Sequence, residues 1–369
     1  MRRAGGRLVR SPNIAAYWSP RGFVLEEFVR RCRITAAPAT IQVLNEFERP
    51  ATASTVARRF PSLDASSVER QVLRLADLGF LVRGSARRMG DVAERWHGLF
   101  PAAFYHFSTR EPTYVLDPEM QTQIFAERLK TAPQPSIYKN YGRTARIALP
   151  KGMPLDETLS EVLSRRRTSR EFGRVEVPLE TFAELVRGTW GQTGTVHAGP
   201  LGTLLLKTSP SAGARNPVEC YVLVRRVRGL RAGLYHYDVR ADCLERLRSG
   251  EFRHEMIAMA SGQRWVGGAA FLCIMTAIAD RVYWKYRSSD SYRLFFLDAG
   301  HLAQTFVLLA TALNLPCFTT AAVQEGRIEE FLGLDGTSEF PIYLCGAGSA
   351  RTVRPGTLAR ARSPVHHDR

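Results

Sequence analysis

A series of short apolar runs in the second half of the chain limits the folds open to it. Five of these runs are strand-like: 218–224, 234–237, 271–278, 317–323 and 340–345. Two helical segments lie among them, one around 251–260 and a long one over 291–313. Helices interleaved with a mostly antiparallel sheet predict an α+β domain.

This α+β domain is predicted to span residues 155–355, and two amphipathic helices open it. Apolar residues recur at helical spacing over 155–163, just before the basic cluster 165–167. Pro178 suits the first turn of a second helix, whose apolar face includes Phe182 and Val186.

The N-terminal part, 1–90, is predicted to be a smaller domain of three short helices and a terminal strand. Thr52 and Asp64 are expected to cap two of the helices, and Gly79 to end the last one before a strand over 80–82. This order is that of a winged helix. Residues 91–154 are expected to form a connector, and residues 356–369 a polar tail.

A winged helix in a basic segment suggests DNA binding, but the expected reading helix offers only Arg70, Gln71 and Arg74 as polar readers. Peptide binding or packing is at least as good an interpretation, so nucleic acid is not an expected partner. The chain has a formal net charge of +16, and 46 of its 51 basic residues are arginine. This charge favours acidic partners such as phosphate or an acidic peptide.

The composition is that of an ordinary globular protein, with 45% hydrophobic residues in 369. The longest apolar stretch, 269–279, is far shorter than the ~20 residues of a bilayer-spanning helix, and no apolar signal-like run follows the basic start. We therefore expect a cytoplasmic protein without a membrane partner. Six scattered cysteines without a CxxC pair are expected to be reduced core residues, and no metal site is predicted.

Residues 166–172, RRTSREF, bring together three guanidinium groups and two hydroxyls at a helix end. Phosphate recognition uses such a set, because planar donors make bidentate contacts and a hydroxyl adds one more. A solvated helix end would look the same in isolation. Taken alone, the segment is better explained as a solvated helix end.

Together with residues 210–217, PSAGARNP, which lead into a strand, this segment resembles the flavin-binding signature of the nitroreductase superfamily. More narrowly, the chain resembles the SagB-type or azoline-oxidase branch, whose flavin dehydrogenases convert thiazolines and oxazolines in ribosomal peptides to thiazoles and oxazoles. Further matching pieces follow in the family's order: GLYHY at 233–237, WKY at 284–286, LDAGHLAQ at 297–304 and PIYL at 341–344. The match covers roughly 155–351, and a winged-helix-like extension is also similar to that branch.

The resemblance implies FMN bound between two subunits of a homodimer. By position, the resemblance gives the phosphate and ribityl contacts of the first motif to Arg166, Arg167, Thr168 and Arg170. Arg351 resembles a C-terminal basic phosphate contact. Ser211, Gly213 and Asn216 fall in the loop that approaches the isoalloxazine, where a small residue lets the backbone reach the ring and an amide can bond its polar edge. The loop after Cys317 departs from the family: many relatives have glycines near the flavin, where this chain has Thr320, Ala321 and Ala322.

In azoline oxidases a Lys-Tyr pair at the position of Lys285-Tyr286 is implicated in catalysis. Azoline oxidation removes an acidic α-proton and a hydride, so a base must face the substrate, and lysine can serve if burial and nearby arginines lower its pKa. An alternative interpretation is a surface lysine beside a packed tyrosine. The prediction is an FMN-dependent dehydrogenase that acts on a precursor peptide, with a YcaO-type cyclodehydratase as a possible partner.

Two other functions stay open from the sequence. The same flavin site could oxidise a cyclic dipeptide or a carrier-bound azoline, or reduce an ene substrate with NAD(P)H. The chain could also be a winged-helix regulator that binds DNA and senses flavin through its C-terminal domain.

Overall fold

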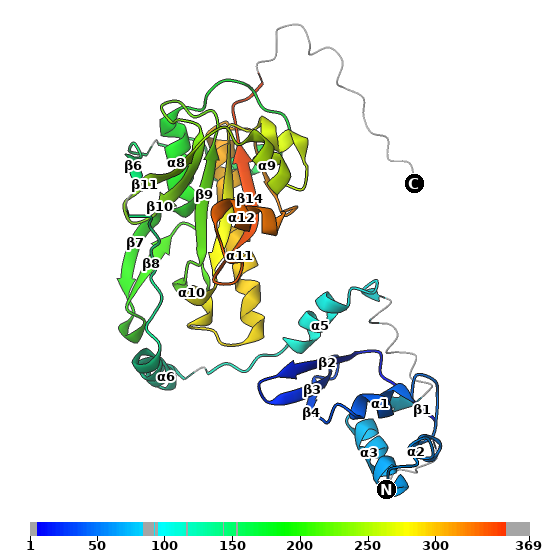
Figure 1. Ribbon diagram of the computed structural model, residues 1–369. Helices are drawn as coiled ribbons and strands as arrows, with labels where there is room; N and C mark the ends of the chain where they lie inside the picture. Colours follow the sequence, from blue (N-terminus) through cyan, green and yellow to red (C-terminus); the bar gives the residue numbers. More distant parts are fainter. Residues whose placement is uncertain are drawn as a thin grey trace. The chain divides into compact units, whose positions relative to one another are not determined.

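The computed structural model describes residues 6–83, 92, 95–115, 117–142, 144–152 and 154–351. The chain divides into two compact units, Met1–Thr113 and Tyr114–Arg369, which we describe separately (Figure 1). The stretch 91–154, predicted as a connector, is shared between the two units. The predicted polar tail, 356–369, lies outside the described residues.

The first unit contains two small sheets and several helices. Strands β1 (Leu8–Arg10) and β5 (Leu81–Arg83) pair with each other, and β2 (Ile14–Ser19), β3 (Gly22–Glu27) and β4 (Cys32–Thr35) form an antiparallel meander. The helices are α1 (Thr40–Asn45), α2 (Ala53–Ala57), α3 (Ala65–Asp77) and α5 (Phe100–Ser108).

The predicted helix caps of this unit are observed. The side chain of Thr52 accepts a hydrogen bond from the backbone N–H of Thr55, and that of Asp64 accepts one from Ser67. Gly79 follows α3 with a positive φ of +86°, a conformation that glycine adopts without strain. Three helices and a strand thus follow one another as expected, while the winged-helix assignment itself stays a prediction.

The second unit is built on one seven-stranded sheet, with strand order β13-β14-β12-β9-β10-β11-β6 and antiparallel pairing throughout. Its strands are β6 (Ala145–Ala148), β9 (Val218–Val224), β10 (Gly233–Asp238), β11 (Cys243–Ser249), β12 (Phe271–Ile278), β13 (Cys317–Thr320) and β14 (Glu339–Ala347). A separate hairpin consists of β7 (Gln192–His197) and β8 (Thr203–Lys207).

The helices of this unit are α6 (Pro118–Thr131), α7 (Leu159–Arg165), α8 (Leu179–Trp190), α9 (Arg253–Met259), α10 (Ala279–Tyr283), α11 (Tyr292–Ala312) and α12 (Glu325–Leu332). All five strands predicted from the sequence are present, and the mixed helix-and-sheet fold class is confirmed. The strands β6 and β11 and the hairpin were not predicted.

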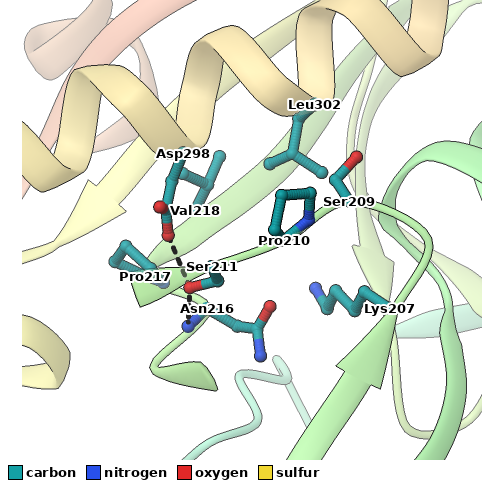
Figure 2. Close-up of a pocket in the computed structure, with 9 residues that line it drawn as sticks. All are labelled: Lys207, Ser209, Pro210, Ser211, Asn216, Pro217, Val218, Asp298 and Leu302. Atoms are coloured by element: carbon teal, nitrogen blue, oxygen red, sulfur yellow. Dashed lines mark hydrogen bonds between the residues drawn. The ribbon is translucent and has the colours of Figure 1, made fainter. Parts of the chain in front are cut away.

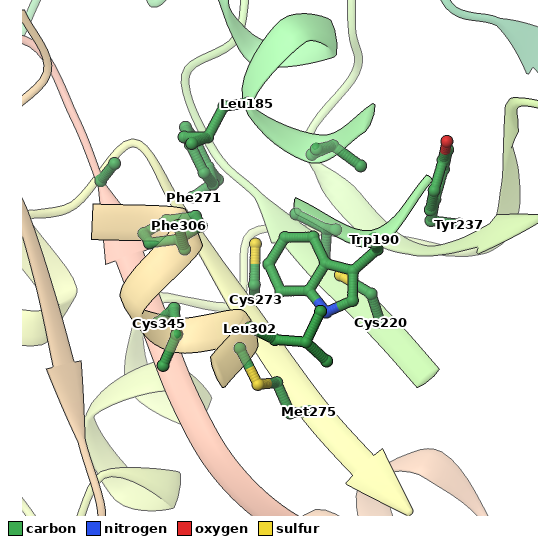
Figure 3. Packing of buried hydrophobic residues seen from close by; sticks show 14 of the residues in the cluster. Leu185, Trp190, Cys220, Tyr237, Phe271, Cys273, Met275, Leu302, Phe306 and Cys345 are labelled. Atoms are coloured by element: carbon green, nitrogen blue, oxygen red, sulfur yellow. The ribbon is translucent and has the colours of Figure 1, made fainter. Parts of the chain in front are cut away.

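Alternation along the strands produces two cores, one on each face of the sheet. In β9, Cys220 and Val222 face the core that includes α8 and α11, whereas Tyr221 and Leu223 face the core that includes α9 and α12. Figure 3 shows the first core, in which the ring of Trp190 lies 5.8 Å from that of Phe306. Both faces of the sheet are therefore covered, and five of the six cysteines are buried, free thiols.

The segment 289–312, which includes α11, is long and apolar enough to cross a membrane by length and composition. One side of it packs in the core through Phe295, Leu302 and Phe306. Its apolar character is that of a central core helix, with Phe296 and Leu297 left exposed on the other side.

Candidate active site

Asp298 of α11 fixes the loop that precedes β9. Its carboxylate accepts hydrogen bonds from the hydroxyl of Ser211 (2.5 Å) and from the backbone N–H of Ala212 (3.3 Å). Ser211 Oγ in turn accepts a bond from the backbone N–H of Asn216 (2.8 Å), so the loop closes on its own first residue. Asp298 and Ser211 are among the residues that line a small cavity, shown as sticks in Figure 2. The cavity volume of about 10 Å³ is close to the minimum that can hold one water molecule.

Gly213, at the centre of this loop, lies directly against Lys285 and Tyr286. Its φ is +57°, and a Cβ placed on it would lie 2.5 Å from Lys285 Nζ and still closer to the hydroxyl of Tyr286. Only glycine fits this position without moving the pair. The structure therefore brings together five residues that the sequence predicted as site residues: Ser211, Gly213, Asn216, Lys285 and Tyr286.

The protonation of the pair is shaped by burial and by Arg215. Burial lowers the pKa of Lys285, and the positive charge of Arg215 lowers it further. Burial raises the pKa of Tyr286, and Arg215 opposes that rise. Both effects make Lys285 easier to deprotonate than an exposed lysine, which an arginine at this position could not be.

The pair is held by the end of α10 and by α6. Lys285 N–H and Tyr286 N–H both donate to the carbonyl of Val282, which continues the helical turn. Arg128 of α6 donates to the carbonyls of Trp284 and Lys285, and its guanidinium lies 5.9 Å from the centre of the Trp284 ring. These contacts fix the backbone from which the amine projects.

A buried network of charged side chains contacts the end of the Ser211 loop. Arg281 of α10, only 2% exposed, donates to the carbonyl of Asn216 and forms an ion pair with Glu219 at 2.6 Å. His236 lies between Glu219 and Glu245, with each ring nitrogen 3.0 Å from a carboxylate oxygen. Each ring nitrogen of His236 therefore has a carboxylate partner.

The other predicted cofactor residues form a second group, which we call the arginine group. Thr168 pairs with Cys317 at the start of β13, and the next residue, Ser169, donates its N–H to the carbonyl of Cys317. Arg170 lies 5.7 Å above the ring of Trp265. The group consists of Arg166, Arg167, Thr168 and Arg170, which precede or lie beside this pairing.

Three further predicted residues lie in the loop that follows β13. Thr320 Oγ1 accepts hydrogen bonds from the side chain of Gln263 and from the N–H of Ala322, while Ala321 and Ala322 are exposed. Arg351 is exposed and forms an ion pair with Glu171 at 2.7 Å, so it lies close to the arginine group. That these residues contact a flavin stays a prediction.

The arginine group and the Lys285 pair lie toward opposite ends of α11 in one chain. Asp298, near the start of α11, holds the Ser211 loop, whereas Arg165, at the end of α7, donates to Asn314 and to the carbonyl of Thr311 near the end of α11. At 1.5 Å per residue, the 13 residues from Asp298 to Thr311 span about 20 Å. One copy of the chain does not bring both groups of predicted residues together.

Three residues of the site escaped the sequence analysis. Arg215 lies in the motif 210–217 and Asp298 in the piece 297–304, but the sequence analysis gave neither a role in the site. Asp298 reaches the Ser211 loop only through the fold. Lys207 lines the small cavity, and burial lowers its pKa to about 8, although Glu219 opposes this. The rarity of lysine in this chain was a usable signal for Lys207, because only five lysines occur.

The comparisons with known proteins agree with this arrangement. The model of the nitroreductase family matches residues 163–349, half of the chain. The chain belongs to the nitroreductase family. A protein of Methanocaldococcus jannaschii named as a nitroreductase, MJ1384, is 31% identical over 56% of this chain and 98% of its own length. The nitroreductase fold of the second unit, predicted from the motifs, is thereby confirmed.

Two relatives come from Rhizobium leguminosarum bv. trifolii. The trifolitoxin-processing protein TfxB is 28% identical over 60% of this chain and 62% of its own length, and the trifolitoxin operon protein TfxC is 24% identical over 78% and 83%. They support the SagB-type branch of the nitroreductase family. A solved structure named as a nitroreductase of Anabaena variabilis has a TM-score of 0.50 at 25% identity over 66% of this chain, which spans about half the length of that protein.

Nitroreductases generally bind flavin, and the residues present here fit FMN. The arginine group offers exposed guanidinium donors and the hydroxyl of Thr168, the donor set that a phosphate requires. The second group of predicted residues contains the Ser211 loop. Because Gly213 of this loop has no side chain, its backbone lies directly against the Lys285 pair. Both ends of the cofactor would therefore find suitable chemistry.

Proposed function

We propose that the protein is an FMN-dependent dehydrogenase that oxidises thiazolines or oxazolines carried by a peptide to thiazoles or oxazoles. The observation that carries the proposal is the half-buried amine of Lys285, held beside Tyr286 against the Ser211 loop, with a lowered pKa. The trifolitoxin names of two relatives support a peptide-modifying role.

The chemistry of the pair follows from its surroundings. Oxidation of an azoline removes a proton from the ring carbon that bears the carbonyl and a hydride from the neighbouring ring carbon. Bound FMN supplies the hydride acceptor. Lys285, as a neutral amine, accepts the α-proton, and the hydroxyl of Tyr286 orients the amine or shares the proton. The Ser211 loop holds both side chains in place through Gly213.

We propose further that the active form is a homodimer in which each flavin lies between two chains. The separation of about 20 Å along α11 supports this, because the arginine group of one copy would face the Lys285 pair of the other. Phe296 and Leu297, exposed on α11, offer apolar surface for such a contact.

Mixed dimers test the shared site. A chain with Arg167→Ala and Arg170→Ala and a chain with Lys285→Ala are each expected to be inactive as homodimers. Refolded together in equal amounts, they should recover about a quarter of the wild-type activity, since half of the dimers are mixed and each mixed dimer has one intact site. Recovery would fail if each chain built its whole site alone.

The first unit is proposed to dock a peptide leader or a cyclodehydratase partner. The similarity to TfxC covers 78% of the chain and so extends well beyond the nitroreductase region. The first 90 residues carry 16 arginines against 7 acidic residues, which suits an acidic leader. Exchange of Arg70 and Arg74 for glutamine should weaken leader binding without changing turnover of a leaderless azoline peptide.

The decisive experiment is incubation of the flavin-loaded protein with a thiazoline-containing peptide in air, followed by mass spectrometry. The loss of two hydrogen atoms per ring, together with the absorbance of a thiazole, supports the proposal. Steady NADPH consumption with reduction of an ene substrate, and no ring oxidation, would instead favour the reductase alternative.

A further inference from the structure

Arg215 is a fully buried cation beside the proposed site. Its side chain is 0% exposed, and its Nε donates to the carbonyl of Arg281. Both terminal nitrogens, Nη1 and Nη2, are buried and have no hydrogen-bond acceptor among the residues that the structure describes. A buried guanidinium without an anionic partner is costly, so its retention calls for a specific reason.

The surroundings of Arg215 are positively charged. Its guanidinium lies 5.6 Å from the centre of the Trp284 ring, and Trp284 immediately precedes Lys285 in the chain. Arg128, from α6, approaches the same indole ring and binds the carbonyl of Lys285. In the described part of the chain, Arg215, Arg128 and Lys285 form no ion pair with a carboxylate.

The nearby acids have other partners. Glu219, on β9, is paired with Arg281 and His236, and Asp298, on α11, accepts bonds from Ser211 and Ala212. The hydroxyl of Tyr286 lies beside Lys285, with the centre of the Tyr286 ring 5.3 Å from Lys285 Nζ. Among the residues that the structure describes, no carboxylate forms an ion pair with the ammonium ion of Lys285.

We propose that Arg215 is an electrostatic positioning residue that keeps the amine of Lys285 in its neutral, proton-accepting form. The inference rests on the proposed function for its purpose, but the state of the amine is a property of the protein alone. Like charges close together in a buried setting cannot both be ionised without a free-energy penalty, and arginine does not lose its proton. The penalty therefore falls on Lys285, whose pKa is lowered by burial and by Arg215.

The small number of lysines makes this measurable without substrate or flavin. Reductive methylation of the full-length protein with carbon-13 formaldehyde labels five lysines, each of which gives an NMR signal that follows its own protonation. A Lys285→Arg variant identifies the signal of Lys285. We expect the midpoint of that signal to lie below the ordinary range of a lysine, and to move upward in Arg215→Gln.

Arg226→Gln is the matched control. Arg226 is a partly buried arginine that, like Arg215, has a buried side-chain nitrogen without a partner, in its case Nε. Its terminal nitrogen Nη2 donates to the carbonyls of Gly173 and Gly268, in another part of the domain. Its removal should leave the Lys285 midpoint unchanged. An equal shift in both variants would show a general loosening of the fold and would overturn the proposal.

Arg215→Lys keeps the test decisive if Arg215→Gln does not fold. A buried lysine, unlike arginine, can lose its proton, so the midpoint of Lys285 should lie between its values in wild type and in Arg215→Gln. A midpoint below that of wild type would overturn the proposal. With an azoline substrate, the acid limb of the rate profile should move to higher pH in Arg215→Gln. Failure of oxidation in every variant, with the NMR shift intact, would count against the proposed function and not against the role of Arg215.

Discussion

The exchange of Gly213 for alanine tests whether the loop sets the position of the Lys285 pair. The new Cβ would lie 2.5 Å from Lys285 Nζ, whereas an ordinary contact is about 3.5 Å, so the amine must move by about 1 Å. A displacement of that size at a reacting group costs about 100-fold in rate. The φ of +57° adds about 1–2 kcal/mol of backbone strain for any residue with a Cβ.

Gly199→Ala separates the two effects. Gly199 has a φ of +51° and nothing within 4 Å of its would-be Cβ, so this exchange adds the strain without the contact. Each kcal/mol of strain should lower the Tm by about 2–4 °C in a domain of this size, similarly in both variants. Only Gly213→Ala should lose turnover of a thiazoline peptide by about 100-fold. Wild-type turnover in Gly213→Ala, or an equal loss in Gly199→Ala, would refute the reasoning.

Three further predictions concern the residues around the pair. Lys285→Ala should retain the flavin absorbance but lose oxidation by about 10²–10⁴-fold, the contribution typical of a general base; loss of the flavin would instead mark a binding role. Asp298→Ala leaves the donors of Ser211 and Ala212 without their acceptor and should cost about 1–3 kcal/mol in chemical denaturation, more than Asp298→Asn, which keeps an acceptor oxygen. Burial raises the pKa of Glu219, but Arg281 and His236 outweigh this effect and hold that pKa at about 2. Its stabilising contribution is complete above about pH 4.5 and is lost as the pH falls toward 2, so Glu219→Gln should flatten the acid side of the stability profile.

Patterns along the chain predicted the elements with strong local signals. The strands 218–224 and 271–278 are apolar throughout because both faces of the sheet are covered, and they were placed correctly. The meander over residues 14–35 was missed, as were β11 and its neighbour β6, which forms one edge of the seven-stranded sheet. Charged residues such as Arg146 and Glu245 interrupt the apolar pattern of these two strands, and only pairing with their neighbours makes them strands.

The candidate site likewise contains residues that the motifs predicted and residues that they did not. Motif order found Ser211, Gly213, Lys285 and Tyr286, and the structure brings them into contact. Their electrostatic setting could not be predicted, because Asp298 reaches the loop across 86 residues and Arg215 acts through burial, which no local pattern records. The wide separation of the arginine group from the pair also follows only from the course of α11.

The ion network around His236 restricts how such a sequence can change over time. The network consists of four buried, mutually paired side chains: Glu219, Glu245, His236 and Arg281. Loss of one member leaves a buried group without its partner, which costs about 3–5 kcal/mol of stability. Joint replacement by apolar residues of similar volume is tolerated. We therefore expect these four positions to vary together among homologues: some homologues should have all four residues, and others should have apolar residues at all four positions.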